Sequence, residues 1–436
     1  MIYLYEESTN YRENMVRILI LDIGNGMNKG NLALLYSTIN TISKSTPNAE
    51  YYLMYYGESG SHSSLKLDEA PLVGEINPQK PLKTILSVVY LFKCLTLGVL
   101  KKIGINIPIS KTSKLYEYYR CDCVVMIGGD TMTPSGKYGV NILTPLINIY
   151  YAVALGRPTV LYGETIGNYN TFIKNIAEHV FNRVSLIIVR EDLSKQYLVQ
   201  NNISTPKVAI TADLAFTLSA ASKQRALDIL SQEGIEILDR PIIGINASRL
   251  IQKYIGGNIL KSEEKLDDIL ARTIDTLLEK LDVNILLVPH VFEPGPITDD
   301  RTAIGEIYLK VKNKSRVSFI NGEYSPQELK AIIGLCDLFV GARMHATIAS
   351  TSMLVPTVGL AYSPKMYGII GEMLGQQKYI VDIKDINYDK LLNTILEAWE
   401  NQTSIKADLE KRMPIVKDRA WLSGKYVKEL IDHHEN

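Results

Sequence analysis

The sequence of 436 residues has no excess of charge of either sign. Lysine plus arginine and aspartate plus glutamate each total 47, so the formal net charge at pH 7 is zero. Proteins that bind nucleic acids carry a marked basic excess, and the composition therefore argues against that class. The hydrophobic and charged contents, 46% and 22%, are ordinary for a globular protein. A chain of this length exceeds one hydrophobic core, so we expect two domains.

Cysteine and histidine are also scarce, with four and six residues. No pair of cysteines has zinc-binding spacing, and Cys121 and Cys123 are poorly placed to bridge each other. A reducing compartment, the cytoplasm, fits this usage best. His290 with Asp299 or Asp300 is the one combination that resembles metal ligands, but no histidines are spaced as a recognised pair. We therefore expect no metal and no cofactor.

Long hydrophobic runs are nearly absent, and the polar N-terminus is unlike a signal peptide. The exception is residues 85–100, which are almost all apolar but too short for a comfortable membrane span and are interrupted by Lys93. Two interpretations stay open. The segment is a buried helix, or it is a helix that lies in a membrane interface and places lysines at the headgroups. The flanking lysines are Lys80, Lys83, Lys101 and Lys102.

Apolar strand-like runs alternate with helical patterns along the chain. Such alternation predicts parallel sheets built from βαβ units. We expect an α/β protein with two Rossmann-like domains, whose ligand cleft lies between the carboxyl edges of their sheets. The predicted ranges are 1–222 for the N-terminal domain with an insertion near 58–118, 240–388 for the C-terminal domain, and 389–436 for a helical tail that packs across the boundary.

The most informative segment is 341–347, followed by 363–365. Each follows a predicted buried strand and opens a predicted helix, with Ser363 as N-cap and Pro364 in the first turn. The two turns bring Arg343, His345 and Lys365 to one sheet edge, where helix N-termini add positive potential. Three basic side chains there predict a site for a small dianion such as a phosphate ester.

Glycines follow the first predicted strand, at Gly24, Asn25 and Gly26. The segment resembles a dinucleotide-binding turn, but the glycine spacing does not match that fingerprint. We interpret it as a turn that lets a substrate approach the backbone.

Polar residues end the following strands of the predicted N-terminal domain. Gly129 and Asp130 end one buried strand, and Asp130 either points into the cleft or caps the next turn. Glu164 and Arg190 occupy similar strand ends. Asp213 lies between apolar residues, so it is either structural or a group that binds the acceptor.

With these residues in place, the chain resembles the polysaccharide pyruvyl transferase family. The resemblance extends over about residues 17–375, and its most specific part is 341–370. It implies a GT-B-like fold. It also implies transfer of pyruvate from phosphoenolpyruvate to two hydroxyls of a sugar, which forms a cyclic ketal and releases phosphate. The acceptor would be a cell-surface polysaccharide or its lipid-linked precursor. The weaker matching segments are the first turn, 127–130, 163–167, 189–192, 213–216, 246–249 and 289–290.

The sequence departs from the family pattern at two places, Met27 to Lys29 and Glu164 to Asn168. Both lie in the predicted N-terminal domain, so they concern the acceptor more than the donor. For the donor, Arg343 can fork onto a phosphate or carboxylate and Lys365 can supply a point charge. His345 can act as the acid. We assign the donor to Arg343, His345, Lys365, Ser363 and His290, and the acceptor to Gly24, Asn25, Gly26, Gly129, Asp130, Glu164 and Arg190, with Asp130 or Asp213 as the base.

Two other classes of function stay open from the sequence. The first is a nucleotide-sugar glycosyltransferase of the same architecture, in which Glu372 would be the ribose-binding carboxylate. The second is a non-catalytic protein of glycan assembly. Under the transferase hypothesis we expect a cytoplasmic enzyme with a peripheral contact to the inner face of the membrane through residues 85–100.

Overall fold

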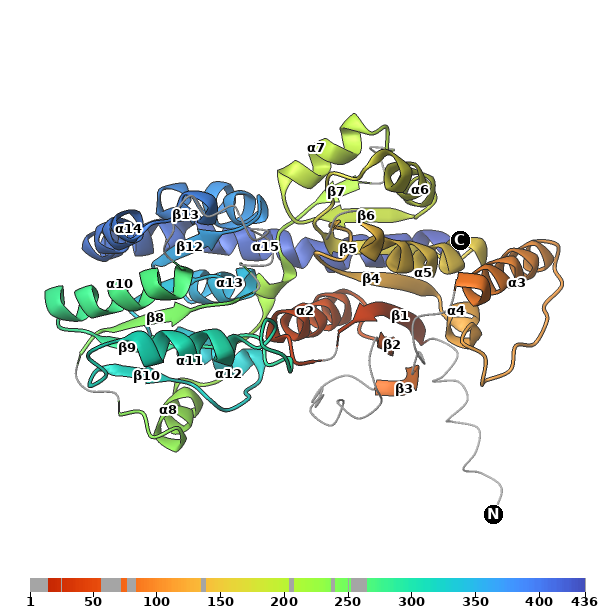
Figure 1. Ribbon diagram of the computed structural model, residues 1–436. Helices are drawn as coiled ribbons and strands as arrows, with labels where there is room; N and C mark the ends of the chain where they lie inside the picture. The colour runs from red at the N-terminus through yellow and green to blue at the C-terminus, as the bar shows by residue number, and fades with distance from the viewer. Residues whose placement is uncertain are drawn as a thin grey trace, which may run out of the picture. The chain divides into compact units, whose positions relative to one another are not determined.

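The computed structural model describes residues 15–24, 26–55, 72–76, 84–134, 139–203, 208–236, 240–249, 251 and 265–435. Its internal contacts divide the chain into two compact units (Figure 1). Unit 1 comprises Met1–Gly26, Leu34–Leu214 and Arg419–Asn436, and unit 2 comprises Met27–Ala33 and Ala215–Asp418. The units divide the chain at Leu214 and Ala215, and seven residues after the first strand belong to unit 2.

Unit 1 is built on a seven-stranded parallel sheet with the order β3-β2-β1-β4-β5-β6-β7. The strands are β1 (Val16–Ile23), β2 (Ala49–Tyr55), β3 (Leu72–Ile76), β4 (Cys123–Gly129), β5 (Thr159–Glu164), β6 (Leu186–Val189) and β7 (Val208–Ile210). The helices of this part of the chain are α2 (Lys29–Ser45), α3 (Thr84–Lys102), α4 (Tyr116–Arg120), α5 (Leu143–Ala154), α6 (Thr171–Phe181) and α7 (Asp192–Gln200).

The central strands are continuous apolar runs because helices cover both faces of a parallel sheet. Every residue of β4 and β5 is buried. Gly128 in β4 is required by its neighbour, since a Cβ there would lie 2.1 Å from the carbonyl oxygen of Gly163 in β5. The carboxyl ends of these strands therefore approach each other closely and place their polar residues side by side.

Unit 2 contains a six-stranded parallel sheet with the order β10-β9-β8-β11-β12-β13. In chain order this is 3-2-1-4-5-6, the arrangement of dinucleotide-binding Rossmann sheets. The strands are β8 (Ile242–Asn246), β9 (Asn284–Leu287), β10 (Val317–Phe319), β11 (Leu338–Gly341), β12 (Thr357–Ala361) and β13 (Ile380–Asp382). The helices are α8 (Lys223–Gln232), α10 (Leu266–Lys280), α11 (Asp300–Lys310), α12 (Pro326–Ile333), α13 (Met344–Ser352) and α14 (Tyr388–Glu400).

The helices of unit 2 form two groups. One contains α10, α11 and α14, and the other contains α8, α12 and α13 (Figure 1). From β8 the chain moves across the sheet toward β10, and from β11 it moves the other way toward β13. Because crossovers between parallel strands are right-handed, the helices of these two halves lie on opposite faces of the sheet. Local sequence supports the helix starts. Ser325 and Glu328 form a complete capping box at the start of α12. The sheet order changes direction between β8 and β11, which makes their carboxyl ends the expected ligand crevice.

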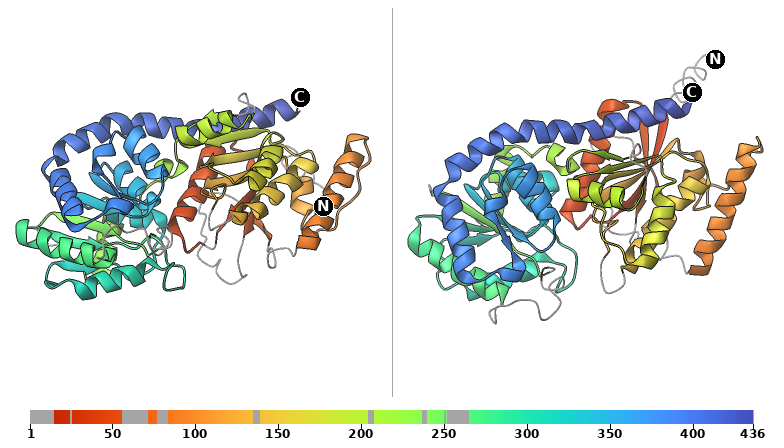
Figure 2. Two further views of the ribbon diagram at one scale, coloured as in Figure 1. Left: turned by 45° about the horizontal axis from the view of Figure 1, so that its top comes forward. Right: turned by 90° about the horizontal axis from the view of Figure 1, so that it is seen from above.

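The predicted C-terminal tail is one long helix, α15 (Gln402–Glu435), which follows α14 (Figure 2). It belongs to unit 2 as far as Asp418 and to unit 1 from Arg419. Its unit 1 part packs tightly, because a Cβ at Gly424 would lie 1.9 Å from the carbonyl oxygen of Thr41. Ser423 donates a hydrogen bond to Thr211 Oγ1 at 3.0 Å within the same unit.

The apolar segment 85–100 forms most of α3, which lies against α5 (Figure 2). Cys94 and Leu97 are buried on the side that meets α5. Gly98 permits the close approach, since a Cβ there would lie 2.0 Å from the carbonyl oxygen of Ala154. The opposite side of α3 is exposed, so the helix is not enclosed in the core. Within the described ranges, no helix has the length and apolar content needed to cross a membrane. Parts of the predicted insertion, 56–71 and 77–83, lie outside the described residues.

Candidate functional site

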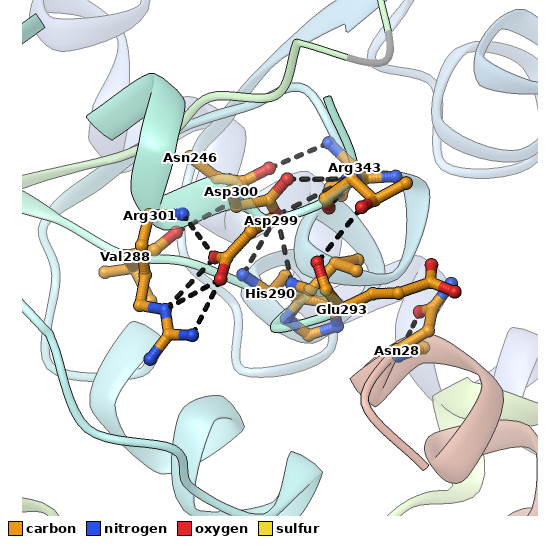
Figure 3. A network of polar contacts seen from close by, with 12 residues as sticks. Asn28, Asn246, Val288, His290, Glu293, Asp299, Asp300, Arg301 and Arg343 are labelled. Carbon is orange, nitrogen blue, oxygen red and sulfur yellow. Dashed lines mark hydrogen bonds and ion pairs between the residues drawn. The ribbon is translucent and has the colours of Figure 1, made fainter. Parts of the chain in front are cut away.

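The first cluster lies in unit 2, where β8, β9 and β11 end. Asn246, the last residue of β8, is fully buried. Its Oδ1 accepts the backbone N–H of Arg343 at 2.9 Å, and its Nδ2 donates to the carbonyl oxygen of Val288 at 2.9 Å. One amide side chain therefore ties together the turns that follow three neighbouring strands (Figure 3). We name Asn246, His290, Asp300 and Arg343 the Arg343 cluster.

Arg343 forms an ion pair with Asp300 in this cluster. Its Nε and Nη2 lie 3.1 and 2.7 Å from Asp300 Oδ1, and Nη2 also donates to the carbonyl oxygen of Thr298 at 3.3 Å. Asp300 Oδ2 accepts the backbone N–H groups of His290 and Val291 at 3.1 and 3.0 Å. Asp300 is completely buried, and Arg343 is 9% exposed. The guanidinium therefore neutralises a buried carboxylate that shapes the 290–300 loop (Figure 3).

His290 is 3% exposed, and neither of its ring nitrogens has a hydrogen-bond partner among the described residues. Burial lowers the pKa of His290 to about 3, and the positive charges of His345, Arg343 and Lys29 lower it further. The ring is therefore neutral near pH 7. Three basic side chains of unit 2 therefore lie close enough to His290 to oppose its protonation.

The turn after β1 joins this cluster. The backbone of Met27 accepts the N–H of Phe292 at 3.0 Å, and the N–H of Lys29 donates to the carbonyl oxygen of His290 at 3.1 Å. Asn28 and Val291 form an isolated antiparallel bridge. Residues 27–33 thus belong to unit 2, whereas the sequence predicts that the whole first turn belongs to the acceptor side. Gly24 and Gly26 stay in unit 1, and Asn25 lies outside the described residues.

Lys29 and Gly30, in the first turn of α2, lie against other site residues of unit 2. Lys29 is 2% exposed, with Nζ 2.5 Å from Glu323 Oε1 and 5.4 Å from the centroid of the Phe292 ring. A Cβ at Gly30 would lie 2.2 Å from His345 Nδ1. The glycine therefore leaves room for the imidazole of His345, which lies in the first turn of α13. Lys29 is a site residue that we did not predict.

The segment that contains Ser363 and Lys365 follows β12, the neighbour of β11. Lys365 is 9% exposed, and its Nζ lies 5.5 Å from the centroid of the Tyr362 ring. Because β11 and β12 are parallel neighbours, their following turns share one edge of the sheet. The helix predicted to open at Ser363 is present, and residues Tyr367–Met373 of it form a π-helix. Such wide turns are rare and are often found at functional sites.

Asp299 and Asp300 have structural partners. Asp299 caps α11 through the N–H of Arg301, and its Oδ2 lies 2.7 Å from Arg301 Nη2. Asp300 neutralises Arg343, as described above. Across the ranges that the structure describes, no group of three or more histidine, cysteine, aspartate or glutamate residues could hold a metal ion.

The second cluster lies in unit 1 at the ends of β4, β5 and β6. We name Asp130, Glu164, Arg190, Glu191 and Asp213 the Arg190 cluster. Arg190 is 1% exposed, and its Nη1 lies 2.5 Å from Asp213 Oδ2 and its Nη2 2.8 Å from Asp130 Oδ1. Its Nε donates to Thr165 Oγ1 at 2.8 Å. The sequence singles out Asp130, Glu164, Arg190 and Asp213, and the structure brings them together with Glu191 around one guanidinium.

Glu164 is the unusual member of the Arg190 cluster. It is completely buried, and no side chain among the described residues donates a hydrogen bond to its carboxylate. Burial raises the pKa of Glu164 well above its ordinary value, and the nearby carboxyl of Asp22 raises it further. Asp22 itself has φ 65° and accepts a hydrogen bond from Thr131 Oγ1 at 2.5 Å. Burial thus favours the protonated form of Glu164 over the ionised form.

The other members of the cluster differ in access to solvent. Asp213 is completely buried against Arg190, so it serves as the buried counter-charge of that residue. The side chain of Asp130 is 43% exposed. Gly129, which precedes it, has φ 125°, a conformation open mainly to glycine. Of the two carboxylates that we considered as a base, Asp130 is the one that solvent reaches.

The two parallel-sheet α/β units define the chain as a GT-B-like protein. A structure of HepE from Anabaena, in complex with UDP and glucose, superposes with a TM-score of 0.59 at 12% identity, over 96% of this chain and 100% of that chain. A putative UDP-N-acetylglucosamine 2-epimerase from Listeria monocytogenes superposes with a TM-score of 0.62 at 10% identity, over 97% of each chain. At such low identities these similarities establish the fold alone.

Sequence comparison gives the family. The chain belongs to the polysaccharide pyruvyl transferase family, whose model matches residues 28–364. It is also 24% identical over 312 residues to the amylovoran biosynthesis protein AmsJ of Erwinia amylovora, over 69% of this chain and 70% of the relative. The protein is thus a glycan-modifying transferase, and the resemblance inferred from its strand-end residues is confirmed.

Proposed function

We propose that the protein transfers a pyruvyl group from phosphoenolpyruvate to two hydroxyls of one sugar in a surface polysaccharide or its lipid-linked precursor. The products would be a cyclic ketal and inorganic phosphate. The observation that carries the donor assignment is the gathering of basic side chains at the strand ends of unit 2, with Lys365 in the neighbouring turn. Arg343, His345 and Lys29 all oppose protonation of the buried His290. Phosphoenolpyruvate has about three negative charges near neutral pH, and its phosphate and carboxylate suit such a region.

The reaction requires an acid that delivers a proton to carbon. Protonation of the methylene carbon of phosphoenolpyruvate makes C2 an oxocarbenium-like centre, which the first sugar hydroxyl attacks. Loss of phosphate by C–O cleavage regenerates that centre, and the second hydroxyl closes the ketal. Of the two hydroxyl protons, one balances the proton added to the methyl group and the other leaves with phosphate. His345, in the first turn of α13, is the proposed acid.

The positive charge that opposes the leaving phosphate comes from the protein in this proposal. Lys365 is a point charge whose described ring contact is with Tyr362. Arg343 is less free to reorient, because Asp300 takes the Nε and Nη2 edge of its guanidinium. We assign a direct phosphate contact to Lys365, whose flexible side chain ends in a point charge. Arg343 positions the 290–300 loop, and its positive charge attracts the donor at longer range. The reaction as proposed calls for no metal and no cofactor.

For the acceptor, we propose unit 1 and its Arg190 cluster. Asp130 is the proposed base because its side chain is the exposed carboxylate of the cluster. Glu164 is the proposed hydrogen-bond donor to a sugar oxygen, since a protonated carboxyl can donate where a carboxylate cannot. Ser363, His290 and the glycines of the first turn keep the binding roles expected from the sequence, as part of the same proposal.

Isothermal titration and phosphate release test the proposal together. Phosphoenolpyruvate should bind the wild type, and UDP-glucose should not. Lys365→Ala should weaken donor binding by roughly 1.5–3 kcal/mol, the range for a charge-assisted hydrogen bond. The matched control is Lys378→Ala, because this lysine is 63% exposed and pairs with Glu397. Binding of UDP-glucose in place of phosphoenolpyruvate would instead favour a nucleotide-sugar glycosyltransferase. The absence of phosphate release with every pyruvate-accepting glycan tried would favour a non-catalytic protein.

A further inference from the structure

The helix α3 presents a continuous apolar stripe to solvent. Phe92 is 67% exposed, Val99 60% and Ile103, just past the helix, 66%. At about 100° per residue, Val88, Phe92, Val99 and Ile103 fall within roughly 60° of one another on the helix surface. Val89 and Leu95 widen the stripe, with exposures of 56% and 39%. A contiguous exposed apolar face of this kind marks an interaction site.

Exposed isoleucines continue beyond the end of the helix, and the hydroxyl group of Thr96 within the stripe is bonded to the helix backbone. Ile105 and Ile107 are 49% and 41% exposed in the segment that follows the helix. Thr96, within the stripe, donates its hydroxyl to the carbonyl oxygen of Phe92 at 2.9 Å. The hydroxyl thus needs no water, which suits an apolar environment.

The charge around the stripe has one sign. Between Glu75 and Glu117 the sequence has seven lysines and no acidic residue, although the whole chain has no net charge. Lys93 and Lys102 are exposed, and the helical step places them on the two opposite borders of the stripe. Two copies of this surface would repel each other, so the charge disfavours self-association through α3. An anionic partner surface would be attracted.

A cavity of about 430 Å³ lies beside the C-terminal end of α3 in unit 1. Lys101, Lys102 and Arg157 line it, with Asp122 as its one acidic residue. Burial lowers the pKa of Lys101, and the charge of Arg157 lowers it further. Of these cations Lys102 borders the apolar stripe, and its charge is one that a phosphate headgroup would neutralise.

From this surface we propose that α3 docks the protein on an anionic phospholipid membrane. The helix lies in the plane of the interface, with Phe92 and its neighbours among the acyl chains and the lysines at the headgroups. The helix does not span the bilayer, because its other side is held by α5. The proposal does not depend on the chemistry of pyruvyl transfer, and its test uses no catalytic assay.

The test is sedimentation of the full chain with vesicles of phosphatidylcholine, with and without phosphatidylglycerol. Wild type should pellet with the anionic vesicles at low salt and far less with neutral ones. The variant Val88→Ser/Phe92→Ser/Val99→Ser should bind at least about tenfold more weakly through loss of apolar burial. The variant Lys93→Glu/Lys102→Glu should lose at least about twentyfold, since each lysine near an anionic surface contributes about fivefold.

Matched controls remove the same groups elsewhere. Val140→Ser/Phe172→Ser/Leu309→Ser removes three side chains that are 58%, 68% and 75% exposed. Lys378→Glu/Lys384→Glu reverses two exposed lysines. Both controls should pellet as wild type does, and all variants should keep the wild-type melting temperature because the substituted groups are exposed.

Two outcomes would overturn the proposal. Wild type that stays in the supernatant at low salt, or an apolar variant that pellets as well as wild type, would show that α3 is not the membrane contact. Light scattering tests the competing interpretation, in which a second copy of the chain covers the stripe. A wild-type dimer that the apolar variant converts to a monomer, together with no vesicle binding, would make the stripe an interface between two copies of the chain.

Discussion

Arg343 and Asp300 form a buried ion pair with Nη2 2.7 Å from Oδ1, and the same carboxylate accepts the N–H groups of His290 and Val291. The side chain that the sequence presents as a ligand for the donor is therefore also the counter-charge of a structural carboxylate. Loss of the guanidinium would change two properties at once, the affinity for an anion and the conformation of the 290–300 loop.

We expect Arg343→Met to lower the free energy of unfolding by about 3–5 kcal/mol, because it leaves the carboxylate of Asp300 buried without its partner. Adding Asp300→Asn should recover part of that loss, since it removes the stranded charge. Urea unfolding measures both. The matched control is Arg301→Met, which breaks the neighbouring pair with Asp299, where the arginine side chain is 38% exposed. Its cost should be about 0–1 kcal/mol. Equal losses at the two arginines would contradict the structural role of Arg343.

The buried carboxyl of Glu164 should make the protein less stable as pH rises. Its pKa is raised in the folded state, so stability is fully present below the unfolded value near 4.5 and is lost as pH rises toward the folded value. Glu164→Gln should flatten this decline and be more stable than wild type at alkaline pH. Unfolding by urea at several pH values measures the effect.

Glu233 provides the control of opposite sign. Burial raises its pKa, but hydrogen bonds from Tyr324, Asn321 and Gly322 outweigh that effect and lower it overall. The stability from Glu233 is therefore present above its unfolded pKa and is lost as pH falls. Glu233→Gln should lower stability at neutral pH and should not flatten the alkaline decline. A Glu164→Gln profile parallel to that of wild type would mean that Glu164 is ionised in the folded protein.

His290 should make the protein sensitive to acid. Burial and the nearby cations lower its pKa to about 3, so the folded protein keeps the ring neutral while the unfolded chain binds a proton below about pH 6.5. Stability from this group is present above pH 6.5 and falls as pH falls toward 3, by about 2 kcal/mol between pH 7 and pH 5. His290→Asn should remove this contribution to the loss of unfolding free energy between pH 7 and pH 5, even if the substitution also changes stability at pH 7.

The control for His290 is His179→Asn, because His179 is exposed on α6 and its hydroxyl partner Tyr150 lies 3.1 Å away. The loss of stability between pH 7 and pH 5 should stay close to that of wild type in this variant. If both variants retain the wild-type loss, the acid sensitivity belongs to other groups and His290 is accessible to protons.

The sequence predicts the strand ends well for a physical reason. Strands buried on both faces, such as β4 and β11, are continuous apolar runs, so the first polar residue after each run marks the carboxyl edge of the sheet. Asp130, Arg190, Asn246 and Arg343 all lie at such positions. Their grouping into one cluster per unit follows from the sheet order, which crossover rules restrict strongly.

The partners of these residues could not be predicted in the same way. Asp300 lies in a loop, and its pairing with Arg343 depends on the path of the chain between residues 290 and 300. Lys29 contacts Glu323, which is 294 positions away. No local pattern distinguishes a lysine in the first turn of a helix that ends up buried from one that stays in solvent. The one available signal was the glycine beside it, because Gly30 stands in a helix, where alanine would otherwise be favoured.

That glycine gives the sharpest test of His345. Gly30 lies in the first turn of α2, where an alanine Cβ would be 2.2 Å from His345 Nδ1 and 3.1 Å from Asn28 Oδ1. Gly30→Ala should therefore displace the imidazole. A displacement of about 1 Å in a catalytic group lowers turnover on the order of a hundredfold. We expect kcat for phosphate release to fall by about that factor and the KM for phosphoenolpyruvate to change much less.

The matched control is Gly305→Ala in α11, where nothing lies within 4 Å of the added Cβ. There the same substitution should raise stability by up to about 1 kcal/mol, because alanine favours the helix, and should leave kcat unchanged. Both variants replace a helical glycine with alanine. They differ in the surroundings of the new methyl group, which would contact His345 in one and nothing in the other. A normal kcat in Gly30→Ala, with its melting temperature unchanged, would show that the position of His345 does not limit the reaction, and the acid would have to be sought in another residue of unit 2.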